Sequence, residues 1–150
     1  MATGEILVTA AGKARPVPVI AVTPQALAAA VKNLSASAQV WARAQGFAGE
    51  AGQHLLVPDE KGELEAVLFG MAATSDPFLP GKLCRLLPEG LYKLESGFQN
   101  LRLAALGWLL EAYGFSRYRK QPQAKARLLC PADVDARSLL SAAKAVTLTR

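Results

Sequence analysis

The sequence has few of the residues that build metal sites, disulfide frameworks and catalytic triads. It contains one histidine and two cysteines in 150 residues. Cys84 and Cys130 lie far apart and in no CxxC pairing, which argues against both a structural zinc site and a disulfide scaffold. His54 would need a nucleophile and an orienting acid to act in a triad, and the sequence does not place them beside it. We therefore expect a reduced, cytoplasmic protein with a structural or exposed histidine.

Long hydrophobic runs are also absent. No segment approaches the roughly 20 apolar residues of a membrane span, and the run at 6–8 is too short for a signal peptide. The hydrophobic share is nevertheless 51%, and alanine supplies much of the excess. Because alanine favours helices that pack closely, the composition indicates helices laid on a sheet rather than an all-β sandwich. A chain of this length fits a single domain with no membrane partner.

Acidic residues are missing between Glu111 and Asp133. Five basic residues fall in that gap: Arg117, Arg119, Lys120, Lys125 and Arg127. Closely spaced cations can bind phosphate backbones through counterion release, but no nucleic-acid fold motif accompanies them. We therefore interpret the segment as a solvated loop or as a surface that faces acids of another domain. Nucleic-acid binding remains an alternative.

The segment RPVPVIAVTPQALAAAVKN (15–33) is typical of a strand followed by a helix. Thr23 is a good N-cap, and Pro24 suits the first helical position because its fixed φ is already helical. Pro16 and Pro18 lack the N–H groups that a paired strand donates. The strand is therefore predicted to lie at a sheet edge or to be paired only in its later half.

A second short helix is predicted at 36–45. Helical spacing places Val40, Trp41 and Ala44 on one apolar face, which we expect to face the core. Gly46 follows as a natural left-handed residue that ends the helix.

Residues 46–70 supply the clearest hairpin. Apolar stretches at 55–57 and 66–69 flank the turn formers of PDEKGE, so they are expected to pair antiparallel. The glycines of GFAGEAG follow a helix and precede a strand, the reverse of a Rossmann turn, and are interpreted as a C-cap and connector. Glu63 and Glu65 share one side of the second strand, which is predicted to face solvent.

Residues 101–113 form an apolar helix that must be covered on most sides, since its large side chains surround the helix axis. Gly107 is expected to permit close backbone approach, and Gly114 to end the helix. Whether the helix is buried wholly within its own domain or also contacts a second domain is left open.

The remaining elements complete an alternating pattern. Strands are predicted at 90–94 and 126–130, and a last helix is predicted to be capped by Asp133 or Asp135. Capping explains these two acids better than a metal-binding DxD, because a metal ion needs several converging ligands. The alternation predicts an α/β fold, with a mixed sheet of about five or six strands and helices on both faces, in a single domain.

Five segments together resemble the N-terminal region of the leucyl aminopeptidase family, the dimetal cytosol aminopeptidases, and in particular its bacterial branch with a compact N-terminal domain. They are WARAQGFAGEAGQHLLVPDEKGELEAVLFG (41–70), LPEGLYKL (87–94), LAALGWLLEAYGFSRYRK (103–120), ARLLCPADVD (126–135) and AAKAVTLTR (142–150). Their order and spacing, rather than any single segment, carry the resemblance.

The resemblance implies that residues 1–150 are the non-catalytic domain and that the C-terminal catalytic domain is absent from this chain. In this family two divalent metals, manganese or zinc, hydrolyse N-terminal residues from peptides. None of the catalytic or metal-binding motifs can be mapped here, so no such residue is assigned. The implied partners are the chain's own catalytic domain and further copies in a hexamer, and the implied roles are assembly and active-site access. Two alternatives remain: a nucleic-acid-binding module that uses 117–127, and a stand-alone small-ligand-binding α/β domain.

Overall fold

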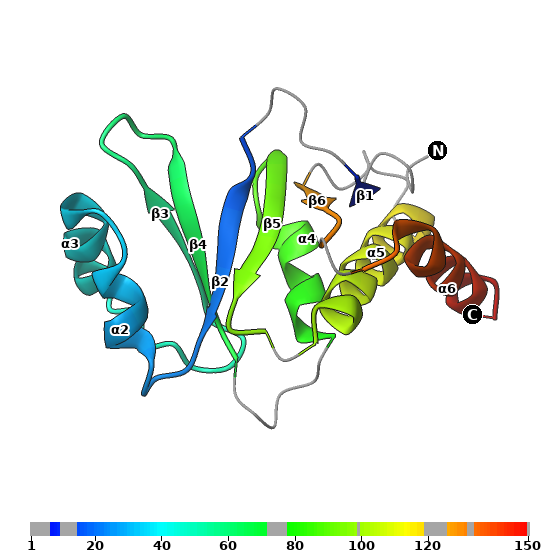
Figure 1. Cartoon of the computed structure of the whole chain (residues 1–150), viewed down its shortest axis with the longest axis horizontal. Helices are drawn as coiled ribbons and strands as arrows, with labels where there is room; N and C mark the ends of the chain where they lie inside the picture. Colours follow the sequence, from blue (N-terminus) through cyan, green and yellow to red (C-terminus); the bar gives the residue numbers. More distant parts are fainter. Residues whose placement is uncertain are drawn as a thin grey trace. The chain divides into compact units, whose positions relative to one another are not determined.

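The computed structural model describes residues 7–9, 15–71, 78–98, 100–118, 126–131 and 134–149, with the backbone alone at 113–118 and 147–149. These residues contain five α-helices and a mixed sheet of six strands, so the predicted α/β fold is confirmed (Figure 1). Contacts divide the chain into two compact units. We name them the hairpin unit, Val17–Ser75 with Glu95–Gln99, and the terminal unit, which comprises Met1–Pro16, Asp76–Leu94 and Asn100–Arg150.

Three strands form the sheet of the hairpin unit: β2 (Val17–Val22), β3 (His54–Pro58) and β4 (Leu64–Gly70). Strand β4 pairs antiparallel with β3 and parallel with β2. The predicted hairpin is therefore confirmed. The register between β2 and β4 begins at Val19, immediately after Pro18, as expected for a strand paired in its later half.

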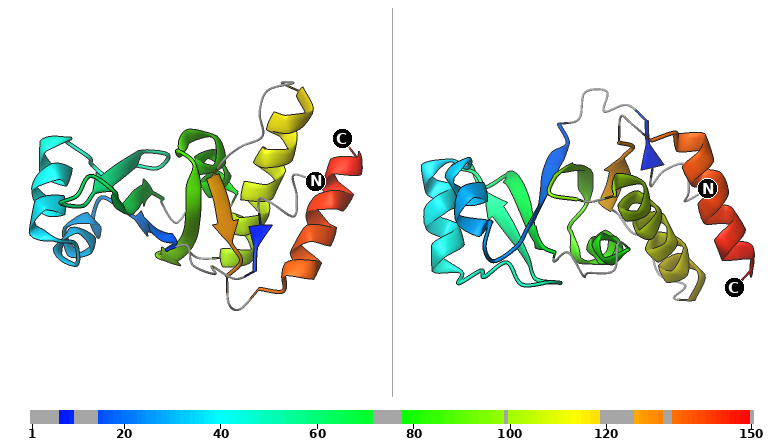
Figure 2. Two further views of the ribbon diagram at one scale, coloured as in Figure 1. Left: turned by 90° about the horizontal axis from the view of Figure 1, so that it is seen from above. Right: turned by 60° about the horizontal axis from the view of Figure 1, so that its bottom comes forward.

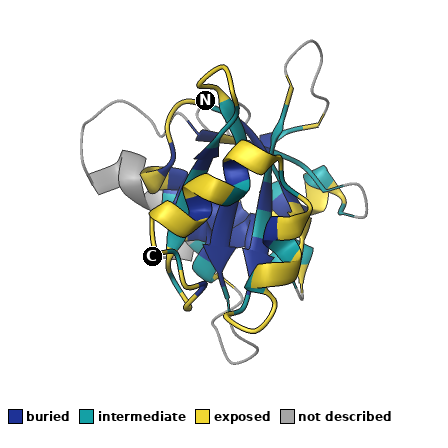
Figure 3. Ribbon diagram, turned by 90° about the vertical axis from the view of Figure 1, so that its left-hand side faces the viewer, coloured by how far each residue is buried: buried dark blue, intermediate teal, exposed yellow. Residues whose placement is uncertain are grey.

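Two helices, α2 (Leu27–Lys32) and α3 (Ala36–Ala44), pack on these strands. Val31 of α2 and Ala38 and Ala42 of α3 share a buried apolar cluster with strand residues. Figure 3 shows the outer faces of both helices exposed and the strands behind them buried. The small side chains of α3 let its backbone lie close to the sheet.

The start of α2 differs from the prediction. The helix begins at Leu27, with Ala26 at the N-cap position and no side-chain cap. Thr23 instead closes a preceding turn, in which the Ala26 N–H lies 3.2 Å from its Oγ and 3.1 Å from its carbonyl oxygen. The Thr23 hydroxyl therefore caps this turn, and α2 begins one turn later than predicted.

The inward face of α3 was also predicted wrongly. Val40 is 65% exposed and Trp41 39% exposed, whereas Ala38 and Ala42 are buried. The Trp41 indole Nε1 donates to the carbonyl of Leu56 at 2.9 Å, which holds the ring against the edge of β3. Gly46, which follows the C-cap residue Gln45 at the end of α3, has φ of +67°. The predicted glycine stop is therefore confirmed.

A side-chain clamp fixes the N-terminus of α3. Ser35 is the N-cap, and its Oγ accepts from the Ala38 N–H at 3.3 Å. The same Oγ donates to Glu65 Oε1 at 2.8 Å, and the Ser35 N–H donates to Oε2 at 3.0 Å. Glu65 therefore joins β4 to α3, a role that its position on the solvent side of the strand did not reveal.

We expect Glu65→Gln to lower the free energy of unfolding by about 1 kcal/mol, because it removes the charge from two hydrogen bonds at the helix cap. Glu63→Gln is the control, an exposed glutamate in the turn just before β4, and its effect should stay within about 0.5 kcal/mol. Urea denaturation followed by circular dichroism measures both. Equal effects of the two substitutions would contradict the clamp.

The terminal unit contains parallel strands. Strand β6 (Ala126–Leu129) pairs with β1 (Leu7–Val8) on one side and with β5 (Gly90–Ser96) on the other. The strands predicted at 90–94 and 126–130 are confirmed. No strand was predicted at 7–8, because so short a segment gives no periodicity.

Helices cover these strands. They are η1 (Leu79–Lys82, a 3-10 turn), α4 (Leu83–Leu86), α5 (Leu101–Tyr118) and α6 (Ala136–Thr149). Helix α5 packs against η1, α4 and α6, and the two long helices α5 and α6 lie side by side (Figure 2). Contacts on several sides explain why its sequence is apolar all round.

Helix α5 runs beyond its predicted end. It continues through Gly114 to Tyr118, so the expectation that Gly114 stops it was wrong. A glycine inside a helix costs only about 1 kcal/mol relative to alanine, which the extensive burial earlier in α5 can offset. The cap of α6 is as predicted, since Asp135 Oδ1 accepts from the Arg137 N–H at 3.1 Å; Asp133 lies outside the described residues.

Candidate functional site

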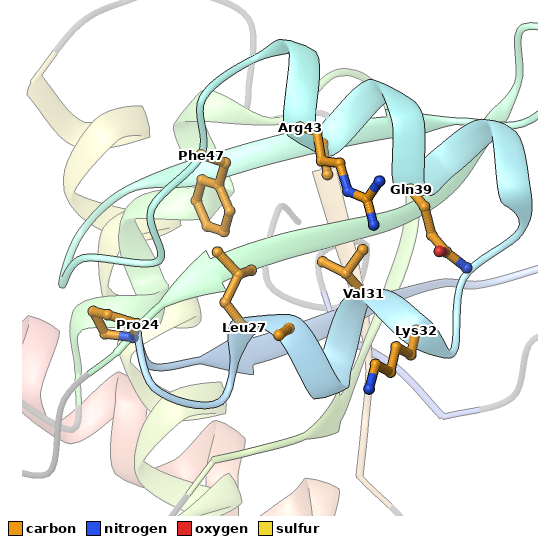
Figure 4. A pocket seen from close by; sticks show the side chains of 9 residues that line it. Pro24, Leu27, Val31, Lys32, Gln39, Arg43 and Phe47 are labelled. Atoms are coloured by element: carbon orange, nitrogen blue, oxygen red, sulfur yellow. The ribbon is translucent and has the colours of Figure 1, made fainter.

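A groove opens between α2 and α3 in the hairpin unit (Figure 4). Its volume is about 320 Å³, and Leu27, Val31 and Phe47 form much of its apolar lining. Leu27 and Phe47 point toward one another across the gap. The hollow exists because alanines, including Ala28 and Ala42, occupy lining positions where larger side chains would meet.

Polar groups line the groove on the side of α3. Gln39 and Arg43 are one helical turn apart and therefore share a face, and Lys32 lines the groove from α2. The Gln39 Nε2 donates to the Leu34 carbonyl at 3.0 Å. Within the described ranges neither Arg43 nor Lys32 forms a salt bridge, whereas Arg85 pairs with Glu111 at 3.1 Å in the terminal unit.

The five basic residues predicted as a contact surface lie mostly outside the described residues. This applies to Arg119, Lys120 and Lys125. Arg117 falls within helix α5, but its side chain is not described. Arg127 is exposed on β6 between two buried neighbours. The arrangement of the group thus lies outside the described residues, and its role stays a prediction.

Residues 17–131, most of the two units described above, match a protein family described as the M17 aminopeptidase, N-terminal domain. The chain belongs to this family. The predicted resemblance to the N-terminal region of the leucyl aminopeptidases is confirmed, although it had placed the distinctive part at about residues 40 to 150.

A solved structure supports the assignment of this M17 N-terminal domain. The cytosol aminopeptidase from Coxiella burnetii superposes with a TM-score of 0.78 at 26% identity, over 97% of this chain and 32% of that one. The chain thus spans about a third of the length of the solved aminopeptidase. A comparison with curated proteins finds no match. Among the described helices, none is long and apolar enough to cross a membrane.

The other candidate chemistry in this M17 N-terminal domain has structural explanations. His54 begins β3, half-buried and opposite Phe69 in the antiparallel register. Gly46, Gly49 and Gly52 all have positive φ in the connector between α3 and β3, as predicted for a C-cap and connector. In the part of the chain that the structure describes, no three His, Cys, Asp or Glu side chains gather as a metal site would require.

Both cysteines are free thiols. Burial raises the pKa of Cys84 to about 12, with a further rise from the Glu111 carboxylate and an opposing effect of the Arg85 guanidinium. Burial also raises the pKa of Cys130, and Asp135 adds to that effect. The Cys130 thiol donates to the Val134 carbonyl at 3.3 Å. Neither thiol has the electropositive surroundings of a nucleophile.

At about pH 8 we expect Ellman's reagent to label Cys130 slowly and to leave Cys84 unmodified in the folded chain, because the thiolate is the reactive form and a raised pKa suppresses it. Labelling of Cys84 at the same pH should appear only when urea unfolds the chain, because unfolding exposes the buried thiol. Cys130→Ser should remove the labelling of the folded chain, whereas Cys84→Ser should leave it unchanged. Two reactive thiols in the folded protein would contradict this expectation.

Sequence reasoning missed the groove. The spacing of Gln39 and Arg43 within the predicted helix 36–45 was a usable signal, since residues four apart share a face. That signal became informative only once the structure showed that Ala42, and not Val40 or Trp41, faces inward.

Proposed function

We propose that this M17 N-terminal domain precedes a catalytic domain in a longer protein, and that it contributes to assembly and to access to the active site. One observation carries the proposal: the fold matches the cytosol aminopeptidase over 97% of this chain but over only 32% of the relative. The relative therefore has a large further portion, in which the catalytic machinery can lie.

In this proposal the catalytic domain removes N-terminal residues from peptides with two divalent metal ions, manganese or zinc. Such ions activate water and polarise the peptide carbonyl. No step through them is assigned to residues of this chain, since the described part of the domain offers no cluster of metal ligands. A hexameric assembly and a cytoplasmic location complete the proposal. The name of the Coxiella protein, a cytosol aminopeptidase, supports that location.

The basic residues between 117 and 127 contribute a contact to the neighbouring domain in this proposal. Exposure of Arg127 on β6 supports their accessibility. Titration of the chain against duplex DNA at two salt concentrations tests the alternative partner. Binding that weakens steeply with salt and is reduced by Arg117→Gln with Arg119→Gln would assign the segment to nucleic acid instead.

The proposal is tested on the longer product of the gene and on a version of it that lacks residues 1–150. Hydrolysis of a leucyl amide gives KM and kcat, and light scattering gives the mass of the assembly. We expect the longer protein to be an active hexamer, and the deletion to change its mass or its KM. A coding region that stops after Arg150, or a deletion that changes neither quantity, would overturn the proposal.

A further inference from the structure

We propose that the groove between α2 and α3 binds a small apolar carboxylate that has no ammonium group beside it, such as the C-terminal residue of a peptide. The apolar part lies between Leu27 and Phe47, and the carboxylate lies on the guanidinium of Arg43. This site goes beyond the proposed function, because it requires neither a catalytic domain nor an assembly.

The size and lining of the groove fit a small apolar group. A volume of about 320 Å³ lies at the lower end of the range of small-molecule pockets, roughly 300 to 1,000 Å³. Leu27 and Phe47 are only half-buried, and both pack against the apolar cluster beneath α2 and α3. A ligand that covers them would remove further apolar surface from water, which favours binding.

The charge of the groove favours an anion. Arg43 extends its guanidinium over the gap between the helices, whereas the Lys32 ammonium points away from it (Figure 4). Guanidinium binds a carboxylate through two parallel hydrogen bonds, a geometry that a lysine cannot provide. Arg43 has no carboxylate partner among the described residues, so its donors are available to a ligand.

The same lining disfavours a free amino acid. None of the described residues that line the groove is acidic, so an α-ammonium group would lie near the Arg43 guanidinium without a counter-ion. A carboxylate next to an amide N–H avoids that cost. Gln39 can accept from such an N–H, because its Nε2 is already bonded to the Leu34 carbonyl and its Oε1 remains an acceptor. An acylated amino acid or a peptide C-terminus therefore fits better than a fatty acid.

Isothermal titration calorimetry of the 150-residue chain with N-acetyl-leucine tests the site. We expect a Kd on the order of 1 mM, given the few atoms of the ligand and the open groove. Leucine carries an ammonium group in place of the acetamide, and N-acetyl-leucinamide lacks the carboxylate. Both should bind at least tenfold more weakly. 4-Methylpentanoate should bind more weakly than N-acetyl-leucine, because it has no N–H for Gln39.

Two pairs of variants locate the binding. Arg43→Gln should weaken binding of N-acetyl-leucine about tenfold, whereas Arg137→Gln, an exposed arginine on α6, should leave it unchanged. Ala28→Leu places a larger side chain in the lining and should abolish binding. Ala29→Leu is its exposed neighbour outside the lining and should not. Matching thermal midpoints confirm that each variant is folded.

Three results would overturn the proposal. The first is no heat of binding when the concentration of N-acetyl-leucine is about ten times the expected Kd. The second is equal binding of N-acetyl-leucine by Arg43→Gln and by the unaltered chain. The third is a free amino acid or fatty acid that binds as tightly as N-acetyl-leucine, which would exclude the peptide-like ligand. Each can occur whether or not the proposed aminopeptidase role holds, so the two proposals fail separately.

Discussion

Gly81→Ala should lower the free energy of unfolding by about 3 kcal/mol. A Cβ at Gly81 would overlap the carbonyl of Gly107, so η1 and α5 touch through their backbones. In the other direction, a Cβ at Gly107 would lie 2.7 Å from the Phe78 carbonyl oxygen. Backbone atoms cannot turn aside as a flexible side chain can, and the two elements would have to separate.

Gly62→Ala is the control for this prediction. Gly62 has φ of +86° with no atom near the position of an added Cβ, so alanine there incurs only backbone strain of about 1 kcal/mol. Chemical denaturation of both variants, followed by circular dichroism, separates the steric effect from the conformational one. A Gly81→Ala variant as stable as Gly62→Ala would contradict the close approach of η1 and α5.

The second large effect is expected at Trp108. This side chain is fully buried, and its indole Nε1 donates to the Ala126 carbonyl at 3.1 Å, which joins α5 to β6. Its ring centroid lies 6.2 Å from that of Tyr92 on β5. Trp108→Phe should cost about 3 kcal/mol, because it removes the buried hydrogen bond to the Ala126 carbonyl and opens a cavity.

Trp41 provides a matched comparison. It also donates to a strand carbonyl, that of Leu56 at 2.9 Å, but it is 39% exposed. Water can replace that hydrogen bond, so Trp41→Phe should cost less than about 1 kcal/mol. The midpoints of urea denaturation give the two values. Similar losses of stability at both positions would contradict the claim that burial makes the Trp108 hydrogen bond the more important of the two.

Local patterns predicted much of the fold. The hairpin of β3 and β4 followed from two apolar stretches around a turn, and the end of α3 followed from Gly46. The later-half pairing of β2 followed from Pro16 and Pro18, which lack the N–H groups that pairing needs. In each case the deciding interaction joins residues that are close in sequence, so the sequence pattern contains it.

The wrong predictions concern features that depend on contacts between residues far apart in the sequence. Val40 and Trp41 have the apolar character of a core face, yet Ala38 and Ala42 are the buried residues of α3. The smaller side chains face the sheet because they let the helix pack closely against it. The clamp on Ser35 by Glu65 likewise joins residues 30 positions apart. Similarly, packing along α5 outweighs the helix-breaking tendency of Gly114.

The family could be predicted from the sequence, whereas the groove could not. The order of segments indicated an aminopeptidase N-terminal domain, and the family match at residues 17–131 confirms it. The groove depends on which faces of α2 and α3 meet, and so on tertiary packing. The basic residues from Arg117 to Lys125 have no described side chains, and their role rests on the proposed experiments.

The central proposal is that this M17 N-terminal domain supports chemistry that takes place in another domain. The most direct test is a continuous assay of leucine p-nitroanilide hydrolysis by the purified 150-residue chain in manganese or zinc, with metal in buffer as the blank. The account predicts a rate equal to the blank. Hydrolysis that co-purifies with the chain, increases in proportion to its concentration and disappears with a metal chelator would contradict it.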